Sequence, residues 1–117
     1  MSYHTIAVTA LTILNGQTDS SILYAQPDFR DGDTLKLYAP GTMPETVKVY
    51  VSPVGSPSSP PQASDWRILS TDSGTDTVLS AGHALSLDLP AFKALKLVAG
   101  GAVAADRVIA VTKGVWA

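Results

Sequence analysis

Short stretches in which apolar and polar residues alternate constrain the fold of this chain more than any other feature. Every second residue is valine in VKVYVS (47–52), and every second residue is leucine in LKLY (35–38) and LSLDL (85–89). A period of two is typical of β-strands that bury one face. No window longer than ten residues has the 3.6-residue period of a helix, and the best helix candidate, residues 90–95, allows one turn at most.

Turn-forming residues separate these stretches at intervals of 8 to 12 residues, which is typical of antiparallel all-β domains. We therefore predict a single domain over residues 1–117, an antiparallel β-sandwich, Ig-like or jelly-roll-like, with about 7–9 short strands. The residues that we expect to form the core are Val47, Val49, Val51, Trp66, Ile68, Leu85, Leu87, Leu95 and Leu97.

The N-terminal stretch contains a change of apolar parity. Ile6 and Val8 occupy even positions, whereas Leu11 and Ile13 occupy odd ones. Because side chains alternate between the two faces of a strand, this change predicts a bulge, a kink or a strand buried on both faces.

Charged residues make up 15% of the chain, against about 25% in ordinary soluble domains. Either much of the exterior meets other proteins, or the surface consists of small polar side chains and has no partner. The net charge of −2 and the lack of a basic cluster argue against nucleic acid as a partner. No apolar run approaches the length of a membrane span, and neither a signal peptide nor a cysteine is present, so we expect synthesis in the cytoplasm.

We identify no catalytic, cofactor-binding or metal-binding residue, and we expect the protein not to be an enzyme. Asp28, Asp31 and Asp33 are clustered in DFRDGD, but the spacing of an EF-hand is lacking, and we interpret the segment as a solvated turn. His4 and His83 share no motif, whereas zinc needs three or four ligands.

A proline- and serine-rich arm, residues 53–64, follows the valine-rich strand. If extended like polyproline II, residues 55–64 would reach up to about 30 Å. Because proline lowers the entropy that a loop loses on binding, we expect the arm and one or both chain ends to contact neighbouring chains. The alternative is a solvated loop. Trp116 either packs against its own domain or anchors a neighbour. The candidate partner-contact residues are Pro53, Pro57, Pro60, Pro61 and Trp116.

Residues 46–112 resemble a recurring pattern in small virion proteins of tailed bacteriophages. The residues that carry the resemblance are Val47 to Pro53, Trp66, Leu79 to Gly82, Pro90 to Phe92 and Leu95 to Gly100. The proline arm replaces a short turn of that pattern, and residues 1–45 have no counterpart in it. The resemblance implies a β-sandwich that coats or joins parts of a phage particle.

From this resemblance we expect a structural virion protein, in the first place a capsid decoration (cement) protein made in the host cytoplasm. Its partners would be the major capsid protein or other virion proteins and further copies of itself. A head–tail connector or tail component is the alternative within this class. A second alternative is a carbohydrate-binding or adhesion module, which needs a flat row of exposed aromatic side chains. Its plausible members are Tyr24, Tyr38, Tyr50 and Trp116, with Trp66 as a further sugar platform if it lies outside the core.

Overall fold

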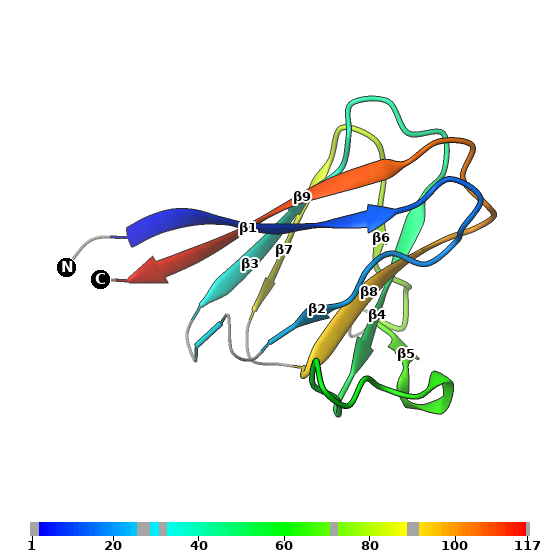
Figure 1. Ribbon diagram of the computed structural model, residues 1–117. Helices are drawn as coiled ribbons and strands as arrows, with labels where there is room; N and C mark the ends of the chain where they lie inside the picture. Colours follow the sequence, from blue (N-terminus) through cyan, green and yellow to red (C-terminus); the bar gives the residue numbers. More distant parts are fainter. Residues whose placement is uncertain (1–2, 26–28, 31–32, 71–72, 89–91, 117) are drawn as a thin grey trace.

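The computed structural model describes residues 3–25, 29–30, 33–70, 73–88 and 92–116 and shows a β-sandwich (Figure 1). The strands are β1 (Tyr3–Ile13), β2 (Leu23–Tyr24), β3 (Thr34–Tyr38), β4 (Val47–Ser52), β5 (Arg67–Ile68), β6 (Val78–Leu79), β7 (Ala84–Asp88), β8 (Ala94–Ala99) and β9 (Arg107–Trp116). The one helical element of this part is a 3₁₀ turn, η1 (Ala63–Asp65). The predicted all-β fold class is therefore confirmed.

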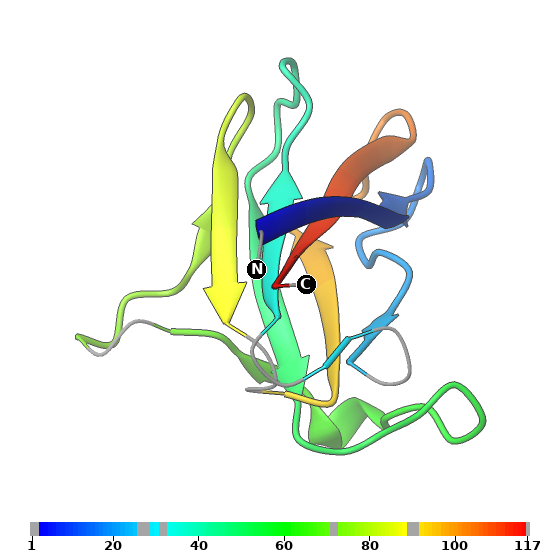
Figure 2. The ribbon, with the colours of Figure 1, turned by 90° about the vertical axis from the view of Figure 1, so that its left-hand side faces the viewer.

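The strands form two antiparallel sheets. One sheet has the order β1-β9-β3-β7; the other has the order β2-β8-β4-β5, and β6 also pairs with β4. In Figure 2 the four-stranded sheet is turned to the viewer, with β7 and β3 side by side, and β8 and β4 of the second layer lie behind it. In Figure 1, β1 and β9 continue past the other strands as a two-stranded ribbon that ends at the two termini.

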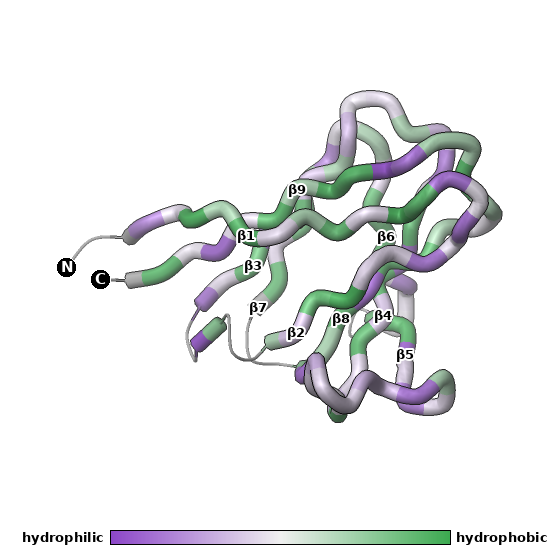
Figure 3. The backbone as a smooth tube through the Cα atoms, viewed as in Figure 1, coloured by the Kyte–Doolittle hydropathy of each residue, from purple (hydrophilic) through white to green (hydrophobic). Residues whose placement is uncertain are grey.

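Apolar side chains from both sheets form one core between them, and Figure 3 shows apolar residues recurring along β4, β8 and β9. Twelve large side chains are almost completely buried: Phe29, Leu11, Ile13, Leu35, Leu37, Leu79, Leu95, Leu97, Ile109, Val47, Val49 and Val103. Of the predicted core, Val47, Val49, Leu95 and Leu97 are fully buried. Val51, Leu85 and Leu87 are partly buried and pack against the core.

Two predicted core residues, Trp66 and Ile68, do not belong to the core. Ile68 is paired with Tyr50, and Tyr50 points outward because its neighbour Val49 points inward. The side of β5 that bears Ile68 is therefore the outer side. Leu69, which donates its backbone N–H to the carbonyl of Val49, contacts the core instead. The prediction of a strand at Arg67–Ile68 was correct, but Leu69, and not Ile68, points to the core.

The parity change in β1 is a β-bulge. Val8 is paired with Val111 and Leu11 with Ile109, so two residues of β1, Thr9 and Ala10, lie opposite one residue of β9. The bulge returns the apolar side chains to the inner face, where Leu11 is 2% and Ile13 is 0% exposed. Of the three explanations that the sequence left open, the bulge is the one found.

The helix candidate at residues 90–95 is not borne out in its described part. Residues 90 and 91 lie outside the described residues, and Ala94 and Leu95 begin β8 instead, paired with β2 and β4. The apolar side chain of Leu95 is fully buried, which a strand in the middle of a sheet explains.

We predict that Val49→Asp prevents folding. The side chain is completely buried, and burying one aliphatic side chain contributes about 1.5–3 kcal/mol, to which the cost of burying a charge is added. The matched control is Val108→Asp, because Val108 is a strand valine that is 54% exposed. Circular dichroism during thermal unfolding would show a cooperative transition for the control only. A cooperative, soluble Val49→Asp protein would contradict the core assignment.

Candidate protein interface

The outer face of the four-stranded sheet is broad and almost without charge. We use the name outer face for the outward side chains of β1, β9, β3 and β7. They are Thr5, Ala7, Thr9, Thr12, Val108, Ala110, Thr112, Gly114, Thr34, Lys36, Tyr38, Ala84 and Ser86. Lys36 is the one charged residue among them, and Asp88, whose side chain lies outside the described ones, occupies the next outward position of β7, opposite Thr34. The outer face is thus one contiguous surface that accounts for part of the low charge content noted in the sequence.

Small side chains make the outer face flat at its centre. The register places Ala7, Thr112, Lys36 and Ser86 in one row across the four strands. A hollow of about 320 Å³ lies over this region, lined by residues that include Thr5, Lys36 and Gly114. The hydroxyls of Tyr38 and Thr112 are 3.2 Å apart and form a hydrogen bond that fixes the aromatic ring on this face.

The outer surface of the other sheet differs, because its charged groups are paired. The Lys96 ammonium lies 2.8 Å from an Asp19 carboxylate oxygen and 4.7 Å from the centre of the Trp66 ring. The hydrogen bond from Lys96 lowers the pKa of Asp19, although partial burial of the carboxyl group opposes this effect. Lys48 and Asp76 form a second pair at 3.0 Å. Trp66 therefore covers a lysine on the surface instead of filling the core.

The proline arm is a compact loop and not an extended segment. Ser56 and Ser59 exchange two backbone hydrogen bonds of 3.1 and 3.0 Å, which close a tight turn around Pro57. At the base of this turn, Gly55 has φ +117° and lies against Pro61. A Cβ atom at position 55 would be 2.6 Å from the Pro61 Cγ. The condition for a reach of about 30 Å, an extended polyproline II arm, is therefore not met.

The four arm prolines of the predicted contact set all lie at the surface. Pro53, Pro57 and Pro60 are exposed, and Pro61 is half-buried against Gly55. Pro57 borders a hollow of about 240 Å³ together with residues 8–11, residues 21–24 and Phe29, so the arm reaches toward its own β1 and β2. Contact of these prolines with another chain stays a prediction.

The chain ends pair with each other along the ribbon, where Tyr3 lies opposite Trp116. The side chain of Trp116 lies outside the described residues, so both interpretations of this tryptophan stay open. Ile6, on the inner side of the ribbon beyond the core, is 42% exposed.

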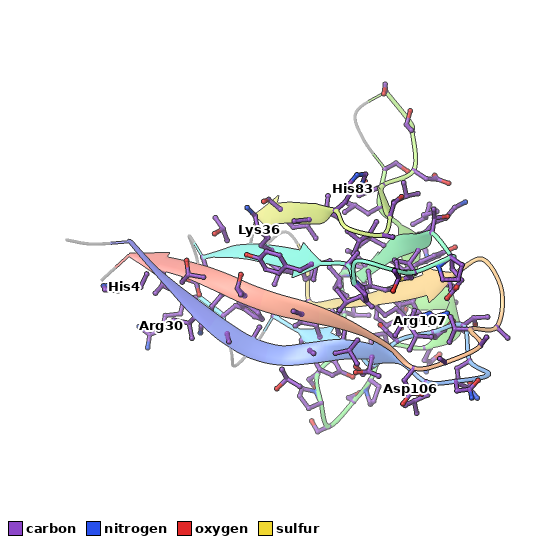
Figure 4. The ribbon with its side chains drawn as sticks, turned by 90° about the horizontal axis from the view of Figure 1, so that it is seen from above. His4, Arg30, Lys36, His83, Asp106 and Arg107 are labelled. Atoms are coloured by element: carbon purple, nitrogen blue, oxygen red, sulfur yellow. The ribbon has the colours of Figure 1, made fainter. Side chains whose placement is uncertain are left out.

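The titratable residues that the sequence raised as metal candidates do not come together in the described part. His4 lies near the free end of the ribbon and His83 next to β7, well separated in Figure 4. Asp33 accepts a hydrogen bond of 2.9 Å from the Arg30 backbone N–H, while residues 28 and 31 lie outside the described residues. Across residues 3–25, 29–30, 33–70, 73–88 and 92–116, no group of three His, Asp or Glu side chains could hold a metal ion.

No protein-family model, no curated protein and no solved structure matches the chain. Within the described residues, no helix has the length and hydrophobicity that a membrane crossing requires. The candidate interface therefore depends on the geometry of the outer face, the ribbon and the arm.

A partly buried ion pair fixes the loops at the end of the sandwich opposite the termini. Arg107 donates from Nε to one carboxylate oxygen of Glu45 at 2.9 Å and from Nη2 to the other at 3.2 Å. This two-point hydrogen bond from the guanidinium group lowers the pKa of Glu45 below its usual value. Next to it, Asp106 accepts the backbone N–H of Asn15 at 2.8 Å. Both contacts connect the start of β9 to other loops.

We predict that Glu45→Gln lowers the midpoint of thermal unfolding at neutral pH and that the difference from the unchanged chain disappears in acid. Since the pKa of Glu45 is depressed in the folded state, its contribution is present above the ordinary value of 4.5. The contribution is lost as the pH falls through the folded pKa. Thermal unfolding from neutral pH to about pH 3 measures this. A difference that stays constant over this range would show that the charge of Glu45 contributes nothing.

Proposed function

We propose that this chain is a structural protein that acts through protein–protein contacts, as a capsid decoration protein of a tailed bacteriophage. The observation that carries the proposal is the outer face, a sheet surface of mostly small uncharged side chains on which Lys36 and, at the end of β7, Asp88 are the charged residues. Surfaces of solitary proteins usually carry dispersed charges, whereas the centres of protein interfaces are depleted in them. The resemblance of residues 46–112 to small phage virion proteins supplies the class of particle.

The flatness of the outer face supports binding to a protein surface more than binding to a small molecule. Small-molecule sites are concave and enclose most of their ligand. Here the hollow over the centre of the face, about 320 Å³, is at the small end of the range for such sites, and Lys36 and Tyr38 line it together with short side chains such as Thr112. Such a surface suits a broad contact in which each residue contributes little. Many copies on one particle would add these weak contacts through effective concentration.

The arm supplies a second surface for the same role. Its turn is held by Ser56 and Ser59 and its base by Gly55 and Pro61, so little conformational entropy remains to be lost on binding. Pro57 and Pro60 are exposed on this preformed loop. The arm therefore suits a partner because its loop is already ordered, and not because it is extended.

A carbohydrate-binding role is the second candidate, and one hollow favours it. Tyr50 and Trp66 line an open space of about 280 Å³ on the outer surface of the five-stranded sheet, together with Asp19 and Lys96. Tyr38, by contrast, lies on the outer face of the other sheet, so the aromatic residues do not form one row. Binding to immobilised glycans that is lost in Trp66→Ala would favour this second role.

We predict that Ala110→Glu weakens binding to phage heads without changing the stability of the isolated chain. Ala110 is exposed and central on the outer face, so a carboxylate there would have to be desolvated at an interface but not in the free protein. Ala104→Glu, at an exposed loop position, is the matched control. Cosedimentation with heads of the phage that encodes the chain measures the effect.

Equal binding of both variants would contradict the assignment of the outer face. A third chain, in which residues 56–62 are replaced by Asn-Gly, tests the arm in the same assay. Quantitative mass spectrometry of purified particles separates the roles within the class. Hundreds of copies per particle indicate decoration, whereas around six or twelve indicate a connector or tail ring.

A further inference from the structure

The free edge of β1 carries a self-complementary segment. We propose that two copies of this chain pair through β1 in antiparallel orientation about a twofold axis at Ala7. This pairing would join their four-stranded sheets into one sheet of eight strands. The inference concerns the isolated protein and does not rest on the virion role.

β1 is an edge strand with one unoccupied side. It is the first strand of the order β1-β9-β3-β7, and among the described residues no strand pairs with its other side between Tyr3 and Leu11. Its last residues are covered there, where Ser21 donates its backbone N–H to the carbonyl of Thr12 at 3.0 Å, and residues 21–24 and Pro57 border a hollow beside residues 8–11. Alternate backbone N–H and C=O groups of an edge strand point away from the sheet and can pair with another chain.

Open space borders this edge. A hollow of about 340 Å³ is lined by Ile6, Ala7, Val8, Thr9 and Lys113. The hollow beside Pro57 adjoins it at residues 8–11. Figure 4, viewed from above, shows β1 along one side of the molecule with its partner β9 on the inner side. The partner strand would lie against Ile6, Ala7 and Val8, and its ends would meet the hollow that residues 21–24 and Pro57 line.

The sequence of β1 lacks the residues that normally prevent edge pairing. Natural edge strands carry lysine, other charges, proline or a β-bulge for this purpose, and the bulge of β1 lies at Thr9 and Ala10, toward one end of the proposed pairing. From Tyr3 to Ile13 the chain has no Lys, Arg, Asp, Glu or Pro, and β1 is eleven residues long. The opposite edge of the same sheet, β7, has only five residues and includes Asp88. Because β1 is longer than β7 and lacks charged residues, β1 is the edge of this sheet that is better suited to pairing with another chain.

The segment Thr5-Ile6-Ala7-Val8-Thr9 reads almost the same in both directions, and this property selects a second copy as the partner. In an antiparallel pair centred on Ala7, each Thr5 faces a Thr9, each Ile6 faces a Val8, and Ala7 faces itself. Threonine pairs and β-branched aliphatic pairs are favourable across strands. The threonines lie on the outer face, and Ile6, 42% exposed, would gain an apolar neighbour.

The neutrality of the segment also agrees with self-pairing. A strand that meets its own copy places every charge opposite or near an identical charge, which is destabilising. A neutral segment avoids this penalty. Because the twofold contact is isologous, it closes after two copies, and β7 of each copy forms the two ends of the joined sheet.

Single cysteines test the register directly, because the chain has none of its own. Across antiparallel strands, facing Cα atoms are about 4.5–5.5 Å apart, within the range of a disulfide. Under mild oxidation, Ala7→Cys should give a covalent dimer on a non-reducing gel. Thr9→Cys should not, because its two copies would be about 13 Å apart along the strand. Ala84→Cys, on the β7 edge, should also stay monomeric.

Sedimentation equilibrium tests the association itself. The unchanged chain should have twice the mass of the 12.2 kDa monomer, and Ala7→Lys should be monomeric because two ammonium groups would meet at the axis. Ala84→Lys should remain dimeric. An equimolar mixture of the Ala7→Lys and Ala7→Glu chains should recover the dimer, which also shows that both variants fold.

Three results would overturn the proposal. The first is an unchanged chain that is monomeric at every concentration. This result would overturn the proposal even if another protein covers β1 in a particle. The second is covalent dimerisation of Thr9→Cys or Ala84→Cys at the rate of Ala7→Cys. The third is a dimer that survives Ala7→Lys.

Discussion

The pairing of β1 with β9 is the contact on which the rest of the structure depends. It joins the first and last strands over residues 3–13 and 107–116. β9 then pairs with β3 on its other side, and β3 with β7, so the order of the whole sheet follows from this ladder. The bulge at Thr9 and Ala10 lets one strand serve two purposes. Leu11 and Ile13 fill the core and Val8 packs against it, while Tyr3 and His4 continue with the end of β9 past the pairing of β9 with β3.

The same arrangement creates the surfaces that we associate with function. Because β1 ends the sheet, its second side is available. Because the outward positions of β1, β9 and β3 are mostly Thr, Ala and Gly, the adjoining face is flat and nearly uncharged. Pairing through β1 would place two such faces side by side in one sheet. A larger continuous surface of this kind would favour attachment to an assembly.

Much of the fold could be predicted from the sequence, because alternation reports which strand face is buried. Val47, Val49, Leu95 and Leu97 are completely buried, as predicted. The inward face of β5 could not be predicted, because two residues of pairing are too short for a periodic signal and the register with Tyr50 decides it. The compact arm was missed for a similar reason. Its shape depends on the close contact between Gly55 and Pro61, which no local pattern encodes.

The candidate interface was visible in the sequence only as a deficit of charge. Composition cannot say where charges are missing, and only the register of β1, β9, β3 and β7 collects the uncharged residues on one face. The parity change in the N-terminal stretch predicted a bulge, a kink or a strand buried on both faces, and the register shows the bulge. That β1 is an edge strand, however, depends on the order of the strands, which apolar periodicity does not contain.

Amide hydrogen exchange of residues 5–9, measured at several protein concentrations, tests the central claim most directly. In a monomer, the outward amides of this edge are unpaired and exchange rapidly. Our account predicts that these amides become protected as the concentration rises, while those of β7, on the opposite edge, do not change. Rapid exchange of the outward β1 amides at every concentration would contradict it.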